Sequence, residues 1–564
     1  MRSWIKTLLI LVIFLGVSTY VNFKSQSIPD PDSLYHIRHA WIYQTNSIFD
    51  SSFPWTQFSA IKTMGADLWY GFHILLIPLT YINDLTIAIK IASIFVTFLV
   101  LASFYLALKN FDIKLSELWV FFFMFSSPAI ITRMTMMRPH PLSLGLTALI
   151  FSFFYPVPSY SADHHSEKGR GEGSLEGLPG NRLRAWYGTS SAILVFIFSF
   201  ILSWIHSSIF WLPVIAVCVL VLFQWLNNQV VSTRKLIAFL SGIITGLLAR
   251  PHPLANLKLI YIQVVDLYLS KNNALAQVIG AELEPPTWET VYIQKWLFLV
   301  LVTALVYLGW LVCKKKFFDT YKKIIILSSL ILTAFSGLMF MTARRAIDQL
   351  GLFGIIFAGS VFSYLLSSKG KVDILKKRTT TVLLFSVVFG LLIYNIVNMD
   401  FRHYHSPVKF KESALWLKDN TKKEDTIFYL NWAYFPFLFF WNQSNYYING
   451  MDPVFFLKYD GKLYRKLLNM AVNGGDKKKY WKLDSMSVID ADGVTCGYRP
   501  KQCGLETIEA VPDVLRNDFH ASYFFVQMNK EKILGYLEKD KENFEKVYEN
   551  EKENTIIFKV RAKF

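Results

Sequence analysis

A short polar segment follows the first apolar stretch of the chain and reads Pro29-Asp30-Pro31-Asp32-Ser33-Leu34-Tyr35-His36-Ile37-Arg38-His39. Pro31 suits the first position of a helix, because its missing N–H would have no partner there. Asp30 is then the predicted N-cap, and Asp32 lies inside the first turn. His36 follows Asp32 by four residues, so both side chains share one helix face. A carboxylate at a helix N-terminus stays ionised because the helix dipole favours the anion, so Asp32 is a candidate catalytic group.

The composition is that of a membrane protein. Of the 564 residues, 53% are hydrophobic and only 18% are charged, whereas soluble domains have about 45–50% apolar and about 25% charged residues. The formal net charge of +17 does not indicate nucleic-acid binding, because the lysines and arginines gather in short loops between apolar runs. That distribution is typical of cytoplasmic loops under the positive-inside rule.

The apolar runs predict about eleven membrane-spanning helices, since a span needs about 20 mainly apolar residues. The first span carries no small-residue cleavage site and is predicted to stay in the mature chain, with the N-terminus in the cytoplasm. An odd number of spans then places the C-terminus outside and every strongly basic loop inside. The predicted spans are residues 4–22, 85–108, 116–132, 142–157, 189–205, 208–226, 236–249, 295–312, 324–342, 351–367 and 381–398.

The chain therefore divides into a membrane domain, residues 1–398, and a soluble domain outside the membrane, residues 399–564. The membrane domain has two long outer loops, at 23–84 and 250–294. The soluble domain reads as mixed α/β. We expect helices at 409–419 and 454–472, and strands at 426–430, 445–449, 522–527, 544–549 and 554–560. In an oxidising compartment its two cysteines, Cys496 and Cys503, can form a disulfide; the alternative is two free thiols.

Several basic residues lie at the outer ends of the predicted spans, where the positive-inside rule predicts few. The tetrapeptide Arg-Pro-His-Pro occurs twice, at 138–141 and 250–253. Arginine pairs well with phosphate through its planar guanidinium, so an anionic lipid headgroup is the expected ligand. The alternative for any single arginine is interfacial anchoring. The predicted phosphate-binding residues are Arg138, His140, Arg250, His252, Arg344 and Arg345.

A metal requirement stays open at this stage. A divalent cation, Mg²⁺ or Mn²⁺, is a candidate cofactor, with Asp32 as its first ligand. His36 and Glu282 or Glu284 join Asp32 in such a site only if the fold brings the two long outer loops together. There is no Gly-x-Ser-x-Gly motif, P-loop or GxGxxG fingerprint.

The order Asp-x-x-x-His-x-Arg, formed by Asp32, His36 and Arg38, resembles the first-loop motif of the GT-C superfamily. These are membrane glycosyltransferases that use polyprenyl-phosphate-linked donors, and the oligosaccharyltransferase catalytic subunits belong to them. The resemblance extends to the plan of many spans, an acidic first outer loop and a terminal soluble domain. The segment Trp204-Ile205-His206 and the Arg-Pro-His-Pro tetrapeptides resemble features of bacterial members.

The resemblance has two departures. The segment Asn431-Trp432-Ala433-Tyr434-Phe435 stands where the oligosaccharyltransferases have Trp-Trp-Asp-Tyr-Gly, with Ala433 in place of the acid. The short outer segment between the predicted spans 116–132 and 142–157 has Arg138-Pro139-His140 in place of the usual acidic pair. These departures weaken the case for peptide-sequon recognition and for tight metal dependence.

Taken together, the resemblance implies an inverting glycosyltransferase in the inner (plasma) membrane, acting on its outer side. Its partners would be a polyprenyl-phosphate-linked sugar donor and a glycan, lipid or protein acceptor. Asp32 would be the general base or a carboxylate that orients the acceptor, and Asp30 mainly a cap. His36 would orient Asp32 or the donor phosphate. Glu282, Glu284, Trp432 and Asp452 would support the acceptor. The alternatives are a transporter or flippase that moves a lipid-linked sugar without cleaving it, and a structural scaffold.

Overall fold

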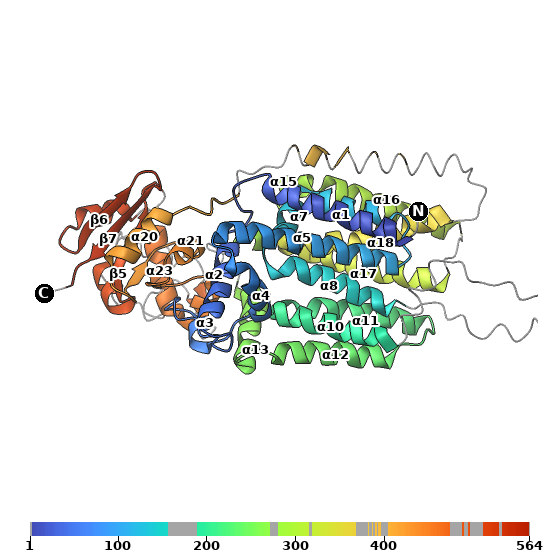
Figure 1. Cartoon of the computed structure of the whole chain (residues 1–564), viewed down its shortest axis with the longest axis horizontal. Helices are drawn as coiled ribbons and strands as arrows, with labels where there is room; N and C mark the ends of the chain where they lie inside the picture. Colours follow the sequence, from blue (N-terminus) through green and yellow to red (C-terminus); the bar gives the residue numbers. More distant parts are fainter. Residues whose placement is uncertain are drawn as a thin grey trace, which may run out of the picture. The chain divides into compact units, whose positions relative to one another are not determined.

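The chain folds into two compact units, each built from segments that are distant in the sequence (Figure 1). The computed structural model describes residues 3–155, 189–270, 280–314, 319–367, scattered positions within 382–397, 404–473, 488–489, 495–496, 511–529 and 533–562. The helical unit comprises Met1–Ser25, Lys90–Ala249 and Ala281–His403. The sheet unit comprises Gln26–Ile89, Arg250–Gly280 and Tyr404–Phe564. The division into domains 1–398 and 399–564 follows the sequence and stays a prediction.

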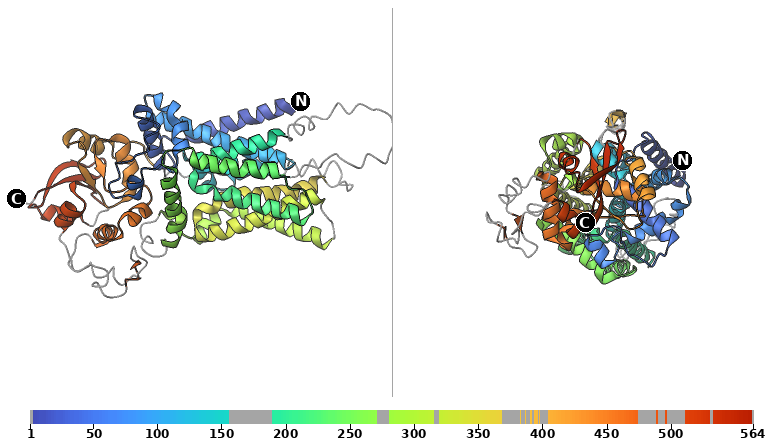
Figure 2. Two further views of the ribbon diagram at one scale, coloured as in Figure 1. Left: turned by 90° about the horizontal axis from the view of Figure 1, so that it is seen from below. Right: turned by 90° about the vertical axis from the view of Figure 1, so that its left-hand side faces the viewer.

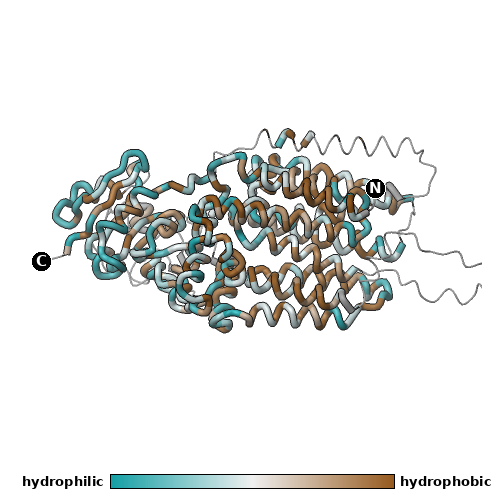
Figure 3. The backbone as a smooth tube through the Cα atoms, in the orientation of Figure 1, coloured by the Kyte–Doolittle hydropathy of each residue, from teal (hydrophilic) through white to brown (hydrophobic). Residues whose placement is uncertain are grey.

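The helical unit is a bundle of long apolar helices that run side by side (Figures 1 and 2). Most of the length of these helices is hydrophobic (Figure 3). The elements are α1 (Ser3–Phe23), α5 (Leu85–Asn110), α6 (Ser116–Phe125), α7 (Pro128–Met134), α8 (Pro139–Phe154), α10 (Thr189–Ile205), η3 (Ser207–Ile209), α11 (Trp211–Leu226), α12 (Thr233–Leu248), η5 (Ala281–Leu283), α15 (Trp288–Ile293), α16 (Lys295–Cys313), α17 (Thr320–Thr342), η6 (Arg344–Ala346) and α18 (Ile347–Ser367).

Six helices of the described residues are long and apolar enough to cross a membrane, or seven if the bent pair Thr233–Leu248 and Pro253–Asp266 counts as one span. They match six predicted spans, and the chain is a helical membrane protein. They are Trp4–Phe23, Leu85–Asn110, Ser207–Leu226, Lys295–Cys313, Thr320–Thr342 and Arg344–Tyr364.

The number of spans is thus smaller than the eleven we predicted from the sequence. The predicted span 116–132 is broken into α6 and α7, because Ser127 caps α7 by accepting a hydrogen bond from Ala129 N–H and Pro128 follows at the first helical position. Helices α8 and α12 have only 16 residues each, and α10 has 17. The predicted span 381–398 lies largely outside the described residues.

Close helix packing in this unit relies on glycine. Gly242 and Gly246 lie one turn apart on α12, which packs against α10. A Cβ atom at Gly246 would lie 2.2 Å from Ser203 Oγ and 2.4 Å from the Phe200 carbonyl oxygen. Small residues four apart allow two helix backbones to approach closely in a membrane. Ser203 then donates a hydrogen bond across the contact to the Ile243 carbonyl at 3.1 Å.

The sheet unit holds a five-stranded sheet in the order β2-β1-β5-β7-β6. Strand β1 (Thr426–Phe428) pairs in parallel with β2 (Tyr446–Tyr447) and β5 (Ala521–Gln527). Strand β7 (Thr555–Val560) pairs antiparallel with β5 and with β6 (Phe544–Asn550). All five predicted strands are present, so the mixed α/β prediction is confirmed for this region.

The helices of the C-terminal segment also match in place. The predicted helix 409–419 is α20 (Lys411–Asn420), and the predicted helix 454–472 is split at Asp460 into α22 (Pro453–Tyr459) and α23 (Gly461–Asn473). The remaining elements of this segment are η7 (Trp432–Tyr434), α21 (Phe435–Trp441), β3 (Val488–Ile489), β4 (Thr495–Cys496), α24 (Val511–Asp513), η10 (Val514–Asp518) and α25 (Leu534–Lys539).

The first long loop is part of the same unit. It contributes α2 (Asp32–Thr45), α3 (Ala60–Met64), α4 (Tyr70–Leu76) and η1 (Ile77–Tyr81), and the second contributes α13 (Pro253–Tyr261), η4 (Ile262–Asp266) and α14 (Leu267–Ser270). Thr56 bridges to Tyr447 of the edge strand β2. Tyr447 N–H donates to the Trp55 carbonyl at 2.7 Å, and Gln57 N–H donates to the Tyr447 carbonyl at 2.8 Å. The first loop therefore extends the sheet, although almost 400 residues of sequence separate the two partners.

Candidate functional site

Helix α2 carries the acidic motif at its first turn. It begins at Asp32, with Pro31 as the N-cap residue and no side chain capping it. The predicted cap at Asp30 is therefore wrong by one position. Asp30 is buried and accepts a hydrogen bond from the Ser33 hydroxyl at 3.5 Å. Asp32 itself is half-buried in the first turn of the helix.

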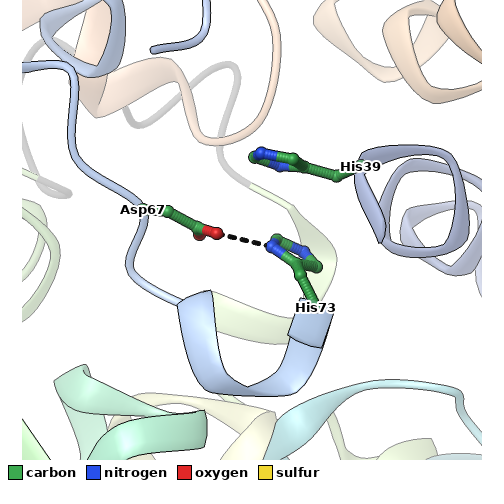
Figure 4. Close-up of side chains that lie close together, drawn as sticks. All are labelled: His39, Asp67 and His73. Atoms are coloured by element: carbon green, nitrogen blue, oxygen red, sulfur yellow. Dashed lines mark hydrogen bonds and ion pairs between the residues drawn. The ribbon is translucent and has the colours of Figure 1, made fainter. Parts of the chain in front are cut away.

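Helices α2 and α4 and the loop before α4 hold a buried network of imidazole, phenol and carboxylate groups, of which Figure 4 draws His39, Asp67 and His73. His73 Nδ1 lies 2.6 Å from Asp67 Oδ2, and His73 Nε2 lies 2.8 Å from His36 Nδ1. Tyr43 donates its hydroxyl proton to Asp67 Oδ2 at 3.0 Å. His36, Asp67 and His73 are each 4% exposed or less. One of the predicted catalytic residues, His36, is thus tied to two residues that we did not predict.

The groups around Asp67 keep it ionised. Burial alone would raise the pKa of Asp67, but electrostatic interactions with His73 and His39 and hydrogen bonds from His73 and Trp69 outweigh burial and hold that pKa well below its ordinary value. Arg250 is also buried, and donates hydrogen bonds to the Asp67 carbonyl at 3.2 Å and to the Leu68 carbonyl at 3.5 Å. Arg250 also interacts electrostatically with Asp67, so it supplies positive charge near the buried carboxylate.

His39 completes the cluster from the next turn of α2. Its Nδ1 lies 2.8 Å from the hydroxyl of Tyr35, also on α2. Burial lowers the pKa of His39 to about 3, and the electrostatic interaction with His73 lowers it further while that with Asp67 opposes the shift. His39 is thus neutral at physiological pH.

His39, Asp67 and His73 form the one group of three potential metal ligands with closely spaced ligand atoms among the described residues. A metal ion would need their lone pairs to converge at about 2.0–2.2 Å. The two rings instead lie almost face to face, with centroids 4.3 Å apart and planes at 31° (Figure 4). Both ring nitrogens of His73 already have hydrogen-bond partners, Asp67 and His36. The group fits a hydrogen-bonded network better than a metal centre, and two imidazoles with one carboxylate do not make the oxygen-rich set that Mg²⁺ prefers.

Arg38 lies on a different face of α2 from Asp32. Its guanidinium carbon is 4.9 Å from the ring centroid of Trp41 and 4.9 Å from that of Phe440. Burial lowers the pKa of Arg38 to about 10. Its Nε has no hydrogen-bond partner among the residues that the structure describes. The two aromatic rings hold the cation in place.

The helical unit contains a second cluster, rich in arginine. Arg133 Nε lies 2.6 Å from Asp348 Oδ2, and one of its terminal nitrogens lies 3.0 Å from Glu282. Arg138 lies 3.9 Å from Glu282, and His140 Nε2 lies 3.5 Å from Asp348. Burial would raise the pKa of Glu282, but the charges of Arg138, Arg133 and Arg345 hold it down to about 2.

The same cluster extends to the segment before α18. Arg344 pairs with Glu284 at 2.8 Å and donates to the Pro285 carbonyl at 3.1 Å. Four arginines thus face three carboxylates: Arg133, Arg138, Arg344 and Arg345 against Glu282, Glu284 and Asp348. The fold brings most of the predicted phosphate-binding residues together, and it also pairs several of them with acids. A guanidinium has five N–H donors, so one ion pair leaves donors for a further anion.

The other predicted site residues are more scattered. Exposed His252 precedes α13 with a left-handed backbone, φ 51°. Trp432 opens η7, where Asn431 caps Ala433 N–H at 3.0 Å. Asp452 is the N-cap residue of α22 but makes no side-chain cap. The predicted disulfide is not described, because Cys503 lies outside the described residues.

Reasoning from the sequence missed Asp67 and His73. The available signal was a lone acid followed six residues later by a histidine, inside the otherwise apolar run from Leu68 to Leu79. The pair Asp67 and His73 is not part of a helical or strand repeat. His36, the partner of His73, comes from another segment.

Comparison with known proteins assigns no family to the chain. No protein-family model matches the sequence, and no curated protein matches it significantly.

Proposed function

We propose that the chain is a membrane glycosyltransferase that moves a sugar or oligosaccharide from a polyprenyl-phosphate donor to an acceptor. In this proposal the sheet unit and the outer ends of the spans face the non-cytoplasmic side of the inner membrane. The observation that carries the proposal is the arginine-rich cluster around Glu282, where Arg133, Arg138 and Arg345 gather beside apolar helices. Such a cluster suits a phosphate whose lipid tail lies among the spans.

Asp32 supplies the proton chemistry of the proposed reaction. A half-buried carboxylate at a helix N-terminus stays ionised. It accepts the proton of an acceptor hydroxyl while the oxygen attacks the anomeric carbon. The C–O bond to the donor phosphate breaks, and direct displacement inverts the carbon.

The leaving group is a phosphate ester, so it needs charge stabilisation more than protonation. Arg138 and Arg345 are the proposed donors of that stabilisation, as members of the arginine-rich cluster beside Glu282. No step of this mechanism requires a metal ion.

The test compares surface glycans of a deletion strain by mass spectrometry after complementation. Asp32→Ala is expected to express normally and to lower transfer by at least about 100-fold, the lower end of general-base contributions. Asp50→Ala is the matched control, because Asp50 is an exposed carboxylate of the same loop. Wild-type glycans in the Asp32→Ala strain would remove Asp32 from the mechanism.

The alternative is transport of the lipid-linked sugar without bond cleavage. The two functions differ in the fate of the donor in the Asp32→Ala strain. A transfer defect leaves the intact donor accessible on the outer leaflet, whereas a transport defect leaves it inside.

A further inference from the structure

Three buried groups form a continuous hydrogen-bonded chain in the sheet unit: Asp67, His73 and His36, here called the relay. The two links measure 2.6 Å and 2.8 Å. The relay joins the loop before α4 to helix α2. It ends four residues after Asp32, on the helix face that Asp32 shares.

Proton positions in the relay follow from the Asp67 end. Asp67 Oδ1 accepts from Trp69 N–H at 2.9 Å, and Oδ2 accepts from the Tyr43 hydroxyl. A carboxylate ion only accepts, so His73 must donate from Nδ1. Arg250 donates to the Asp67 main-chain carbonyl and interacts electrostatically with the Asp67 carboxylate, so His73 need not be the countercharge. A neutral His73 then has an unprotonated Nε2, which accepts a hydrogen bond from the Nδ1–H of His36.

We propose that Asp67 and His73 are positioning residues that hold His36 in its Nδ1–H tautomer, leaving the His36 Nε2 lone pair as a proton acceptor one turn from Asp32. When a proton binds His36 Nε2, the His36 Nδ1–H bond breaks and a bond forms at His73 Nε2. His36 stays neutral, His73 becomes an imidazolium, and Asp67 remains a carboxylate that stabilises it. Charge and atoms balance without any further reactant.

The catalytic consequence rests on the proposed function. The acceptor proton that Asp32 takes up would pass to His36 and regenerate the Asp32 carboxylate. The tautomer itself does not depend on that function. The other titratable or charged groups around the relay are Tyr35, His39, Tyr43, Tyr70 and Arg250.

The test is solid-state NMR of the full chain in liposomes, with ¹⁵N-labelled histidine and His36→Gln to assign the signals. The wild type is expected to show His36 with a protonated Nδ1 and an unprotonated Nε2. A His36 signal with its proton on Nε2 would overturn the proposal without any reference to a variant.

The substitution Asp67→Asn is expected to reverse the tautomer of His36. Trp69 N–H is a backbone donor and cannot change, so the amide oxygen must stay at the Oδ1 position and the NH₂ group must face His73. His73 Nδ1 then accepts, His73 Nε2–H donates to His36 Nδ1, and His36 carries its proton on Nε2. A folded Asp67→Asn protein with an unchanged His36 tautomer would contradict the relay.

Tyr43→Phe is the matched control, because it removes a donor to Asp67 but leaves the carboxylate. It should leave the His36 tautomer as in the wild type. Zinc chloride is the probe for the metal alternative. Loss of the His73 Nδ1 proton signal on binding one Zn²⁺ would replace the relay with a metal site.

The transfer assay and the NMR experiment can refute the proposed function and the relay independently of each other. If Asp32→Ala retains transfer while the His36 tautomer is as expected, the proposed function falls and the relay stands. If Asp32→Ala abolishes transfer but Asp67→Asn leaves its rate and pH profile unchanged, the relay has no part in the reaction.

Discussion

At the residue scale, the histidines of α2 have different roles because of their partners. His36 is linked to a carboxylate through His73, whereas His39 is bonded to the Tyr35 hydroxyl. Burial keeps His39 neutral. A neutral buried histidine lowers stability in acid, since the unfolded chain binds a proton that the folded chain does not.

This difference predicts a pH dependence. The pKa of His39 is lowered from 6.5 to about 3. The unfolding free energy of the wild type should therefore fall as pH decreases through this window, by up to about 1.4 kcal/mol per pH unit from this one group. His39→Asn should give a shallower slope, measured by thermal melting between about pH 6.5 and 4.5. Other buried histidines also contribute, so some pH dependence should remain in His39→Asn. The role of His39 would be contradicted if the stability of both proteins changed with pH at the same slope.

At the scale of elements, α10 and α12 form a close helix contact. It depends on the absence of a side chain at Gly246, where a Cβ would meet the backbone carbonyl oxygen of Phe200. Backbone cannot move aside as a flexible side chain can, so the helices would have to separate.

We therefore expect Gly246→Ala to lower stability by about 1–3 kcal/mol, the usual cost of overpacking. Gly309→Ala in α16 is the matched control, because nothing lies within 4 Å of its added Cβ. That variant should be neutral or slightly stabilised, since alanine favours helix over glycine. Thermal melting in one detergent compares the two, and equal melting temperatures would argue against the close contact.

Prediction from the sequence succeeded where one element carries its own signal. The strands at 522–527 and 554–560 are runs of aromatic and β-branched residues, and β5 and β7 lie there. It failed where a polar break interrupts an apolar run, as at Ser127 and Pro128. The relay could not be predicted, because the contact of His36 with His73 depends on how α2 packs against α4.

At the scale of the whole molecule, three distant segments build the sheet unit. The first loop is not a free connection, because its backbone pairs with strand β2 and Ile28 bridges to His405. The candidate catalytic helix α2 is therefore held by the C-terminal part of the chain.

Hydrogen exchange of the full chain tests this arrangement. The amides of Gln57 and Phe58 donate to Tyr447 and Ile448, so their peptide should exchange as slowly as the peptide containing β2. The exposed neighbouring segment around Asp50 provides the internal control. Exchange of both peptides at the same fast rate would show that the first loop does not join the sheet.

Sugar transfer is tested most directly by following the fate of the donor. Purified protein in liposomes would be given a polyprenyl-phosphate-linked sugar and an acceptor, and the lipid products would be measured by mass spectrometry. We expect the wild type to release sugar-free polyprenyl phosphate and Asp32→Ala to release it at least about 100-fold more slowly. Donor lipid that crosses the membrane with its sugar–phosphate bond intact, equally in both proteins, would contradict the transferase function.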